Sequence, residues 1–481
     1  MIRMNPIFKT DSYKVAHHRL FPDGMTYGKT YTESRGGPTN GFPFVALQIW
    51  LDELAEETIT MADVEEARPF FQKHFLGADI MPYEGFKIIV NEYGGKYPVR
   101  IKAVDEGSYV PTNNVLFTVE STDERLFWLP GWLETASLRA GWYGSTFAGN
   151  DFDISTVLYK YLTMTSDAPD TLLPSRNHDF GARGASSSEE ASIGGAVHTL
   201  ISEGSDTLEG IVTANRVYGL DMAAFSIPAT EHSVTTAHGR NGEALVVSKM
   251  LQRFPGAPLG AVVADSYDVK HFVDVIIGEE LKQAIIDSGK LLVVRPDSGD
   301  AIANVVYILQ SLDRNFGSIV NGKGYKVLDG VAVINGDGNS RDSIAAICQA
   351  VKNAGFSLDN VAFGTGGGLY REGITRDRYK FATKLCLAIV NGENVPVFKS
   401  PVDQPDKKSK AGDLDLVKVN GRYLTIDRLQ NTMPNTPSEL KVRYENGTLF
   451  NRAIGSEVRE RINQARKAVV EHELAQGQVR F

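Results

Sequence analysis

A series of short apolar runs, each ending in polar or glycine-rich residues, constrains the fold of this chain more than any other feature of its sequence. Five such runs follow one another at intervals of about 30–40 residues in the middle of the chain. The run at 291–294 is Leu-Leu-Val-Val, and it ends in Arg-Pro-Asp-Ser-Gly-Asp. The other runs cover residues 223–228, 260–264, 330–334 and 360–363. A short, wholly apolar run bounded by turn residues is typical of a strand that is buried on both faces.

Stretches with helical spacing, such as Ser343–Ala354, separate these runs. Buried strands that alternate with helices indicate a parallel sheet with helical crossovers. The polar residues all follow the carboxyl ends of their strands, and such residues meet at one end of a closed parallel sheet. The sequence therefore predicts an α/β barrel with its active site at the C-terminal mouth.

The two ends of the chain have a different character. Residues 97–120 alternate like strands, and the stretches 414–426 and 439–452 each suggest two strands around an Asn-Gly turn. These segments resemble one another more than they resemble the middle of the chain. We expect both ends to build one mixed α+β domain around an inserted barrel, with residues 1–150 and 385–481 in the first and 151–384 in the second.

Composition and charge limit the classes of function. The 481 residues are 42% hydrophobic and 23% charged, which is ordinary for a globular protein. A net charge of −9 argues against a nucleic-acid-binding surface. The two cysteines form no metal-spaced pair, so we expect a reduced, cytoplasmic protein. No apolar run approaches the ~18 residues of a membrane span.

The last two strand ends suggest an anion site. Residues 335–338 are Asn-Gly-Asp-Gly and residues 364–368 are Gly-Thr-Gly-Gly-Gly. Glycine lets the backbone approach an anion closely, and α/β barrels often bind phosphate at their last two strand ends. Leu369 breaks the GxGxxG pattern, which argues against a dinucleotide. Basic residues that follow suggest a second anion, although a solvated basic surface is the favoured interpretation for any single lysine: Arg376, Lys384, Lys399 and Lys407.

Two residues at strand ends have simple structural alternatives. Asp206 is a candidate N-cap for a helix that begins near Leu208. His232 fits a buried, hydrogen-bonded histidine, but Glu231 beside it and its place after a strand favour chemistry. The chain contains no H-E-x-x-H and no G-x-S-x-G pattern, so zinc-protease and serine-hydrolase functions are excluded.

Seven motifs along the chain resemble those of the nicotinamide phosphoribosyltransferase family, in order and in approximate spacing. The resemblance extends from about residue 5 to residue 475. The motifs lie at residues 10–14, 178–184, 228–233, 265–268, 295–299, 336–338 and 363–369.

The resemblance implies a type II phosphoribosyltransferase: an α/β barrel with a second domain, acting as a homodimer with shared active sites. It implies transfer of phosphoribosyl from phosphoribosyl pyrophosphate to nicotinamide, with Mg²⁺ and with ATP coupled through a phosphohistidine at His232. The alternative within the same fold is a nicotinate phosphoribosyltransferase. A non-catalytic binding protein on the same scaffold is the alternative of a different class.

The resemblance also implies roles for individual residues. Nicotinamide would be bound by Tyr13 of the partner subunit, Phe180, Arg183 and Asp206. The phosphoribosyl group would be bound by Asp265, Arg295, Asp297, Gly336, Asp337, Gly367 and Gly368. Pyrophosphate would be bound by Arg35, Arg376, Lys384, Lys399 and Lys407. His232, Arg295 and Asp297 would be catalytic, and Asp297 would also hold Mg²⁺ through water.

Overall fold

The computed structural model describes residues 4–336, 338–400, 403, 409–430 and 433–476. The chain divides into two compact units, each built from two stretches of sequence. Unit 1 consists of Met1–Gly149 with Gly373–Arg461, and unit 2 consists of Asn150–Glu372 with Ile462–Phe481. Two of the boundaries fall inside long helices, α5 (Glu134–Thr165) and α16 (Gly455–Ala475).

These boundaries differ from the expected ones at two places. Residues 373–384 belong to unit 1, because β14 (Phe381–Val390) pairs with β1 (Met25–Ser34) along most of its length. The C-terminal part of α16 belongs to unit 2, because Arg466 is fully buried there and its Nε donates to Ser155 Oγ at 3.0 Å.

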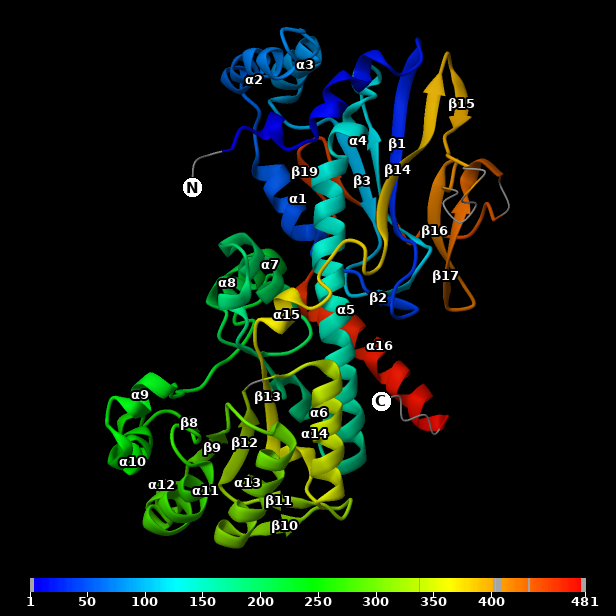
Figure 1. Cartoon of the computed structure of the whole chain (residues 1–481). Helices are drawn as coiled ribbons and strands as arrows, with labels where there is room; N and C mark the ends of the chain where they lie inside the picture. The colour runs from blue at the N-terminus through cyan, green and yellow to red at the C-terminus, as the bar shows by residue number, and fades with distance from the viewer. Residues whose placement is uncertain (1–3, 337, 401–402, 404–408, 431–432, 477–481) are drawn as a thin grey trace. The chain divides into compact units, whose positions relative to one another are not determined.

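A parallel six-stranded sheet forms the centre of unit 2 (Figure 1). Its strands lie in the order β7, β6, β13, β12, β9, β8, and every neighbouring pair is parallel. Four of the five apolar runs lie on these strands, as predicted. The bounds are β6 (Asn177–Asp179), β7 (Gly204–Ser205), β8 (Leu259–Val263), β9 (Leu291–Arg295), β12 (Val331–Asn335) and β13 (Val361–Thr365).

A short segment, residues 225–230, joins the two edges of this sheet. On one side, Phe225 exchanges two backbone hydrogen bonds, 2.7 and 3.1 Å long, with the edge formed by β7. On the other side, Pro228 and Thr230 exchange two with Ala261 of β8, 2.9 and 3.0 Å long. The parallel strands thereby close into a barrel. The fifth predicted strand is reduced to these isolated bridges, since Pro228 has no N–H to donate.

Apolar side chains fill the interior of the barrel. Ala261 of β8, Val293 of β9 and Ile334 of β12 form a buried cluster, and Phe180 packs against it from the end of β6. Alternate residues of each strand point inward, so these side chains form a packed core rather than a channel. A ligand is therefore restricted to the mouth of the barrel.

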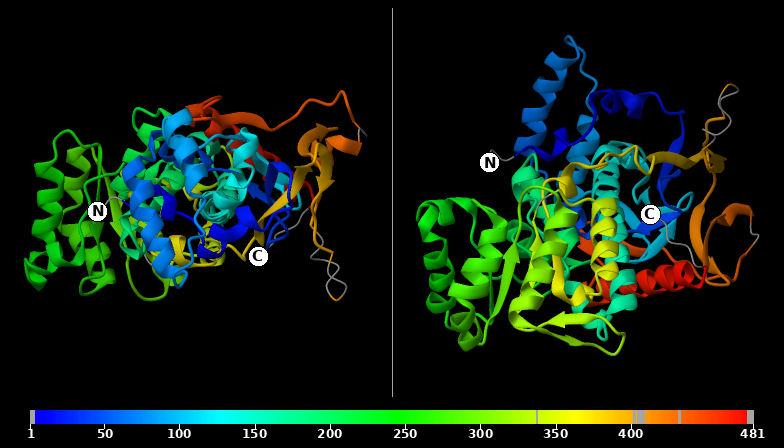
Figure 2. Two further views of the ribbon diagram at one scale, coloured as in Figure 1. Left: turned by 90° about the horizontal axis from the view of Figure 1, so that it is seen from above. Right: turned by 60° about the horizontal axis from the view of Figure 1, so that its bottom comes forward.

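Helices surround the strands of unit 2, as Figure 1 and the two turned views of Figure 2 show. Two of them, α7 and α8, approach closely, because a Cβ added to Gly210 would lie 2.4 Å from the backbone of Gly195. The helices are α6 (Pro169–Leu172), α7 (Ser188–Thr199), α8 (Leu208–Tyr218), α9 (His232–Thr236), α10 (Glu243–Arg253), α11 (Val269–His271), a π-helix (Phe272–Glu280), α12 (Lys282–Ser288), α13 (Ala301–Phe316), α14 (Arg341–Asn353) and α15 (Gly368–Arg371).

Strand β6 is polar although it lies between two other strands. Asn177 donates to Asp151 at 3.0 Å and accepts from Thr365 at 2.5 Å. Asp179 accepts from the hydroxyl of Tyr370 at 2.7 Å. Buried polar groups are tolerated where they have hydrogen-bond partners, and here these partners come from α5, β13 and α15.

Unit 1 is built on an antiparallel sheet with helices, which agrees with the predicted α+β character. Its seven strands lie in the order β15, β14, β1, β5, β3, β18, β19. Besides β1 and β14, they are β3 (Val99–Ala103), β5 (Val115–Ser121), β15 (Glu393–Pro396), β18 (Lys441–Glu445) and β19 (Thr448–Leu449). Outside this sheet lie β2 (Gly41–Pro43), β4 (Tyr109–Pro111), α1 (Leu47–Glu56), α2 (Met61–His74), α3 (Tyr83–Tyr93) and α4 (Leu129–Trp132).

The two Asn-Gly turns of unit 1 are confirmed. Asn420 and Gly421 have φ values of 49° and 77°, and they join β16 (Leu414–Val419) to β17 (Arg422–Asp427). The second turn joins β18 to β19 in the same way. Both residues of such a turn need a positive φ, which asparagine and glycine adopt most readily.

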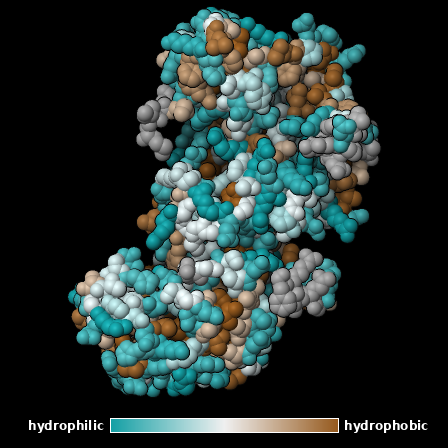
Figure 3. Space-filling model, in the orientation of Figure 1, coloured by the Kyte–Doolittle hydropathy of each residue, from teal (hydrophilic) through white to brown (hydrophobic). Residues whose placement is uncertain are grey.

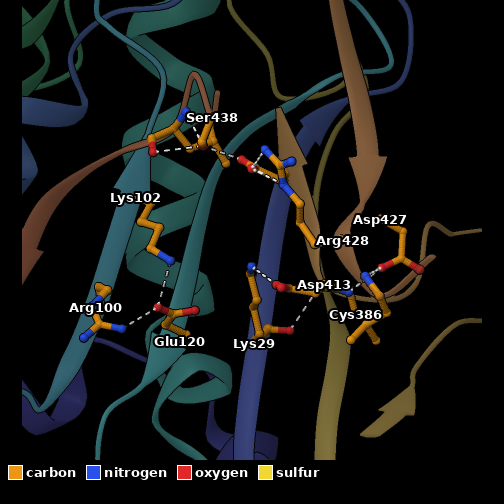
Figure 4. Close-up of polar contacts among 12 residues, drawn as sticks. Lys29, Arg100, Lys102, Glu120, Cys386, Asp413, Asp427, Arg428 and Ser438 are labelled. Atoms are coloured by element: carbon orange, nitrogen blue, oxygen red, sulfur yellow. Dashed lines mark hydrogen bonds and ion pairs between the residues drawn. The ribbon is translucent and has the colours of Figure 1, made fainter. Parts of the chain in front are cut away.

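Charged side chains connect the strands of unit 1 (Figure 4). Lys29 of β1 contacts Asp413, just before β16, at 2.5 Å, and the side chain of Lys29 is buried. Glu120 of β5 contacts both Arg100 and Lys102 of β3, at 3.1 and 3.3 Å. In both groups one partner, Lys29 or Glu120, is buried while Asp413, Arg100 and Lys102 remain about one third exposed. Opposite charges on neighbouring strands support their pairing.

No helix within the described residues has the length and apolar character needed to cross a membrane. The face of the protein in Figure 3 is mostly hydrophilic, and its hydrophobic residues occur in small separate groups. Cys348 and Cys386 are both buried and unpaired with each other.

Candidate active site

The mouth of the barrel gathers polar side chains from every strand end. Because all strands are parallel, their carboxyl ends lie at the same edge. Most of the barrel residues that the sequence suggested are at this edge or in the loops just beyond it. The residues that follow or end the strands are Asp179, Asp206, Asp265, Arg295, Asn335 and Thr365.

Asp206 is the acceptor at one side of the mouth. Its Oδ1 lies 3.1 Å from Nε2 of His178 and accepts a hydrogen bond from Oγ of Ser226 at 2.5 Å. Burial alone would raise the pKa of Asp206, but the bonds from His178 and Ser226 outweigh this effect and lower it. The carboxylate is therefore ionised at neutral pH. The alternative role as helix cap is wrong, because Thr207 occupies the N-cap position of α8.

Phe180 supplies a flat ring beside this acceptor. Its ring centroid lies 4.9 Å from that of His178, and the guanidinium carbon of Arg295 lies 5.5 Å from it. A Cβ added to Gly364 would lie 2.0 Å from the ring, so only glycine admits Phe180 at this place. The loop that follows Phe180 also exposes Arg183, in the turn Ala182–Gly184.

A chain of charged groups crosses the mouth from β9 to β8. Arg295 donates to Asp297 at 3.2 Å. Nδ1 of His232 lies 3.8 Å from Asp297, and its Nε2 lies 3.2 Å from Asp265. Asp265 in turn accepts from Ser298 at 2.5 Å. His232 is half-exposed, so it is not the buried structural histidine of the simpler interpretation.

Arg295 has donor capacity left for a ligand. Its Nε is buried and has no hydrogen-bond partner among the described residues. A buried guanidinium nitrogen without a partner is costly, and an anion at the mouth would remove this cost. Gly336 lies against the same group, since a Cβ there would be 2.9 Å from Nε of Arg295 and 2.5 Å from Asp297.

Asn339 holds the end of β13, where the glycine-rich loop begins, by a hydrogen bond to the backbone. Asn339 donates to the carbonyl of Gly364 at 2.8 Å and to that of Asn335 at 2.9 Å. Gly367 contacts Gly184 so closely that a Cβ on Gly184 would lie 2.5 Å from its Cα. Gly367 and Gly368 begin the short helix α15. Asp337, suggested for the same site, lies outside the described residues.

Unit 1 contains a separate cluster of cations. Lys384 on β14 lies opposite Tyr31 on β1. Burial lowers the pKa of Lys384. The charge of Glu134 opposes this effect, and the nearby charges of Arg35, Lys14 and Lys399 lower the pKa further. These cations therefore lie near one another, together with Glu134, which contacts Lys14 at 3.0 Å. An excess of positive charge of this kind attracts polyanions. Three of the predicted pyrophosphate ligands, Arg35, Lys384 and Lys399, are thus brought together.

The other two predicted pyrophosphate ligands are not placed in this cluster. Arg376 is exposed and contacts its neighbour Asp377 at 3.0 Å. Lys407 lies outside the described residues. Tyr13, suggested as a stacking residue for a partner subunit, is 61% exposed on the short helix Ser12–Arg19 of unit 1.

A buried carboxylate that sequence reasoning missed orients the cluster. Glu33 is only 2% exposed, accepts from Nε of Arg35 at 2.7 Å, and contacts Nζ of Lys410. The N–H of Lys410 also donates to the hydroxyl of Tyr31 at 3.0 Å, and Ser409 exchanges hydrogen bonds with the backbone of Lys399. In the sequence Glu33 is an ordinary acidic residue two positions before Arg35, and nothing local indicates that it is buried.

The donor set at the mouth fits a magnesium ion that is held mainly by a substrate. The described residues contain no group of three His, Cys, Asp or Glu side chains arranged for a metal. Mg²⁺ commonly binds one or two carboxylates, several waters and phosphate oxygens. Asp297 and Asp265 are suitable for that role.

Two family models match the sequence. The model of the nicotinate phosphoribosyltransferase (NAPRTase) family matches residues 175–448. The model of the N-terminal domain of nicotinamide phosphoribosyltransferase matches residues 5–101. Between them they cover parts of both units.

Characterised relatives match the chain over nearly its whole length. The nicotinamide phosphoribosyltransferase of Xanthomonas campestris pv. campestris is 40% identical over 468 residues, which cover 96% of this chain and 99% of the relative. The nicotinamide phosphoribosyltransferase of Acinetobacter baylyi is 28% identical and covers 96% of this chain and 98% of its own.

Two solved structures support the fold. Nicotinate-nucleotide pyrophosphorylase from Pyrococcus furiosus has a TM-score of 0.62 at 16% identity, over 96% of this chain and 95% of that one. Human nicotinic acid phosphoribosyltransferase has a TM-score of 0.56 at 15% identity, over 95% of this chain and 93% of that one. The predicted type II phosphoribosyltransferase fold is confirmed. The chain belongs to the nicotinate phosphoribosyltransferase family and, within it, to the nicotinamide phosphoribosyltransferases.

Proposed function

We propose that this protein transfers a phosphoribosyl group from phosphoribosyl pyrophosphate to nicotinamide, forming nicotinamide mononucleotide and pyrophosphate in NAD salvage. The bond between ribose C1 and the pyrophosphate oxygen breaks, and a bond between C1 and the pyridine nitrogen forms. The observation that carries the proposal is the combination of a flat ring, Phe180, with an ionised acceptor, Asp206, at the mouth of a phosphoribosyltransferase barrel.

Nicotinamide is recognised by its ring and by its amide. The ring stacks on Phe180, since flat rings gain from offset or edge contacts with one another. The amide NH₂ donates to Asp206, because an ionised carboxylate only accepts hydrogen bonds. Nicotinate presents a carboxylate instead and would meet a like charge. Arg183 in the neighbouring loop lies at the ring side.

Ribose and its phosphate occupy the remaining strand ends. Asp297 accepts from the ribose hydroxyls, while Arg295 donates to a phosphate through its unpartnered nitrogen. Gly367 and Gly368 let the 5′-phosphate approach the backbone. Positive charge that develops at ribose C1 is stabilised by nearby carboxylates, and the departing pyrophosphate by cations.

The active form in this proposal is a homodimer with shared sites. The cations Arg35, Lys384 and Lys399 of one subunit bind the pyrophosphate at the barrel mouth of the other, and the exposed Tyr13 covers the pyridine ring there. Tyr13→Ala and Asp297→Ala subunits, each inactive alone, regain activity when mixed if sites are shared. Verified heterodimers without activity would contradict shared sites.

ATP is a coupled co-substrate in this proposal. A ring nitrogen of His232 accepts the γ-phosphoryl group of ATP, and ADP leaves; water later cleaves the P–N bond and releases phosphate. Asp265 and Asp297 orient the ring from two sides. Mg²⁺, held by Asp297 through water, neutralises phosphate charge when it is bound. We assign the reaction to the cytoplasm, where the two free, buried cysteines stay reduced.

A substrate comparison tests the function. Purified protein is given phosphoribosyl pyrophosphate with nicotinamide or with nicotinate, with and without ATP, and the mononucleotide product is measured. We expect a preference for nicotinamide of roughly a thousandfold or more, since two like charges in a site that Phe180 and Tyr13 close off from water cost several kcal/mol. Asp206→Asn should lower the ratio of kcat/KM for nicotinamide to kcat/KM for nicotinate. Asp287→Asn on the surface of α12 is the control and should leave this ratio unchanged. Efficient use of nicotinate by the unaltered protein would favour the nicotinate alternative.

A further inference from the structure

The two carboxylate oxygens of Asp206 have different surroundings. Oδ1 makes both side-chain contacts: it lies 3.1 Å from Nε2 of His178 and 2.5 Å from Oγ of Ser226. In the part of the chain that the structure describes, no group donates a hydrogen bond to Oδ2. The side chain is nevertheless 48% exposed. One oxygen is therefore occupied by the protein, and the other is available to a ligand.

His178 is fixed in the position from which it reaches Oδ1. Strand pairing places it opposite Gly204, and a Cβ on Gly204 would lie 2.7 Å from Nδ1 of the ring. Its other side lies near Phe180, with ring centroids 4.9 Å apart. The ring is therefore confined between a strand that must carry glycine and the residue proposed to stack on the substrate. Its contact with Asp206 holds Oδ1 of the carboxylate in place.

Ser226 approaches the same oxygen from another element. It lies in the segment that closes the barrel, next to Phe225, whose backbone hydrogen bonds tie it to the β7 edge. Two donors from different elements fix a carboxylate in two directions. A carboxylate that loses one donor is free to rotate and to take up a proton more easily, since hydrogen bonds to the charged form favour it.

We propose that His178 and Ser226 are positioning residues that set the choice between an amide and a carboxylate on the pyridine ring by acting through Asp206. This inference rests on the proposed function. Both hold Asp206 through Oδ1 and so leave Oδ2 to accept from the amide NH₂. Without them, Asp206 can be protonated and donate to the carboxylate of nicotinate. They need not touch the substrate to have this effect.

The test is a double-mutant cycle on base selectivity, measured as the ratio of kcat/KM for nicotinamide to that for nicotinate. His178→Phe removes the donor, and His178→Gln retains an amide donor near the position of Nε2. We expect His178→Phe to narrow the ratio about tenfold, which corresponds to about 1.4 kcal/mol. His178→Gln should restore most of it. In the Asp206→Asn background, His178→Phe should cause no further change.

Ser226→Ala provides a second test that removes a single oxygen atom and so carries little risk to folding. It should narrow the ratio in the same direction, and Ser226→Thr should retain selectivity. Ser248→Ala on α10, which removes a hydroxyl bonded only within its helix, is the control and should leave the ratio unchanged.

Three results would overturn the inference. The first is an unchanged ratio in folded Ser226→Ala. The second is that His178→Phe narrows the ratio equally in the unaltered protein and in the Asp206→Asn variant, because His178 would then act on the substrate directly. The third is no rescue by His178→Gln. Failure of the proposed function is distinct: the unaltered protein would then form no nicotinamide mononucleotide, or Asp206→Asn alone would leave the ratio unchanged.

Discussion

Gly336→Ala is the substitution that most directly tests the charged centre of the mouth. Gly336 follows β12, and its N–H donates to the carbonyl of Pro296 at 3.3 Å, so its backbone is tied to the loop that carries Asp297. An added Cβ would lie 2.5 Å from Oδ1 of Asp297 and 2.9 Å from Nε of Arg295. Neither contact is sustainable, so both side chains must move.

The size of the movement sets the size of the effect. An ordinary contact between a carbon and a second heavy atom is roughly 3.5 Å, so the Asp297 carboxylate has to shift by about 1 Å. A misplacement of about 1 Å at a reacting centre lowers the rate about a hundredfold. This corresponds to about 2.7 kcal/mol of transition-state stabilisation. The fold should survive, because the displaced groups lie at the open end of the barrel.

The assay is kcat/KM for phosphoribosyl pyrophosphate, with thermal unfolding measured in parallel. Gly256→Ala is the matched control, because a Cβ there meets nothing within 4 Å. We expect about a hundredfold loss in Gly336→Ala and none in Gly256→Ala, with similar melting temperatures. A Gly336→Ala protein with full activity would refute the roles given to Asp297 and Arg295 in this geometry.

Three further outcomes are expected. Burial alone would lower the pKa of the fully buried His198, but Asp151, 2.8 Å away, raises it to about 9 from 6.5. The stabilisation from protonated His198 is therefore fully present below pH 6.5 and is lost as the pH rises through 9. Denaturant titrations below pH 6.5 and above pH 9 will detect this loss. A free energy of unfolding that does not change between these pH values would mean that the His198 ring is neutral throughout. Lys410→Met should raise KM for phosphoribosyl pyrophosphate roughly tenfold, because it frees the segment that positions Lys399. The surface substitution Lys418→Met is the control and should leave KM unchanged. Equal KM values in the two variants would argue against this positioning. His232→Ala should lose ATP-stimulated turnover and keep slow synthesis without ATP, and retention of full coupling would exclude His232 as the phosphate acceptor.

The sequence predicted the barrel strands that are apolar and missed the one that is polar. β9 and β12 were identified because each is a short run of Val, Leu and Ile between turn residues. β6 consists of Asn177, His178 and Asp179, which resembles a loop by every local measure. It is a strand only because Asn177 and Asp179 find buried partners on distant elements. Such partners are invisible in a single sequence.

Site residues were predictable by type but not by pairing. The carboxylates and arginine after β8 and β9 were found because they follow recognisable strand ends. The contact of His178 with Asp206 depends on the register of β6 against β7, which are only three and two residues long. The burial of Glu33 under Arg35 depends on strand β1 lying inside its sheet.

The segment that closes the barrel also has a consequence for how the protein changes over evolutionary time. Residues 225–230 join the sheet by four backbone hydrogen bonds, whereas β9 is paired on both sides along its length. Amide hydrogens of this seam should exchange with solvent before those of β9, since weakly paired elements open locally without global unfolding. Ser226 lies on the seam. Substitutions in residues 225–230 can therefore change the ligand preference. Of the segments that form the barrel wall, this is the one whose rearrangement disturbs the other strands least.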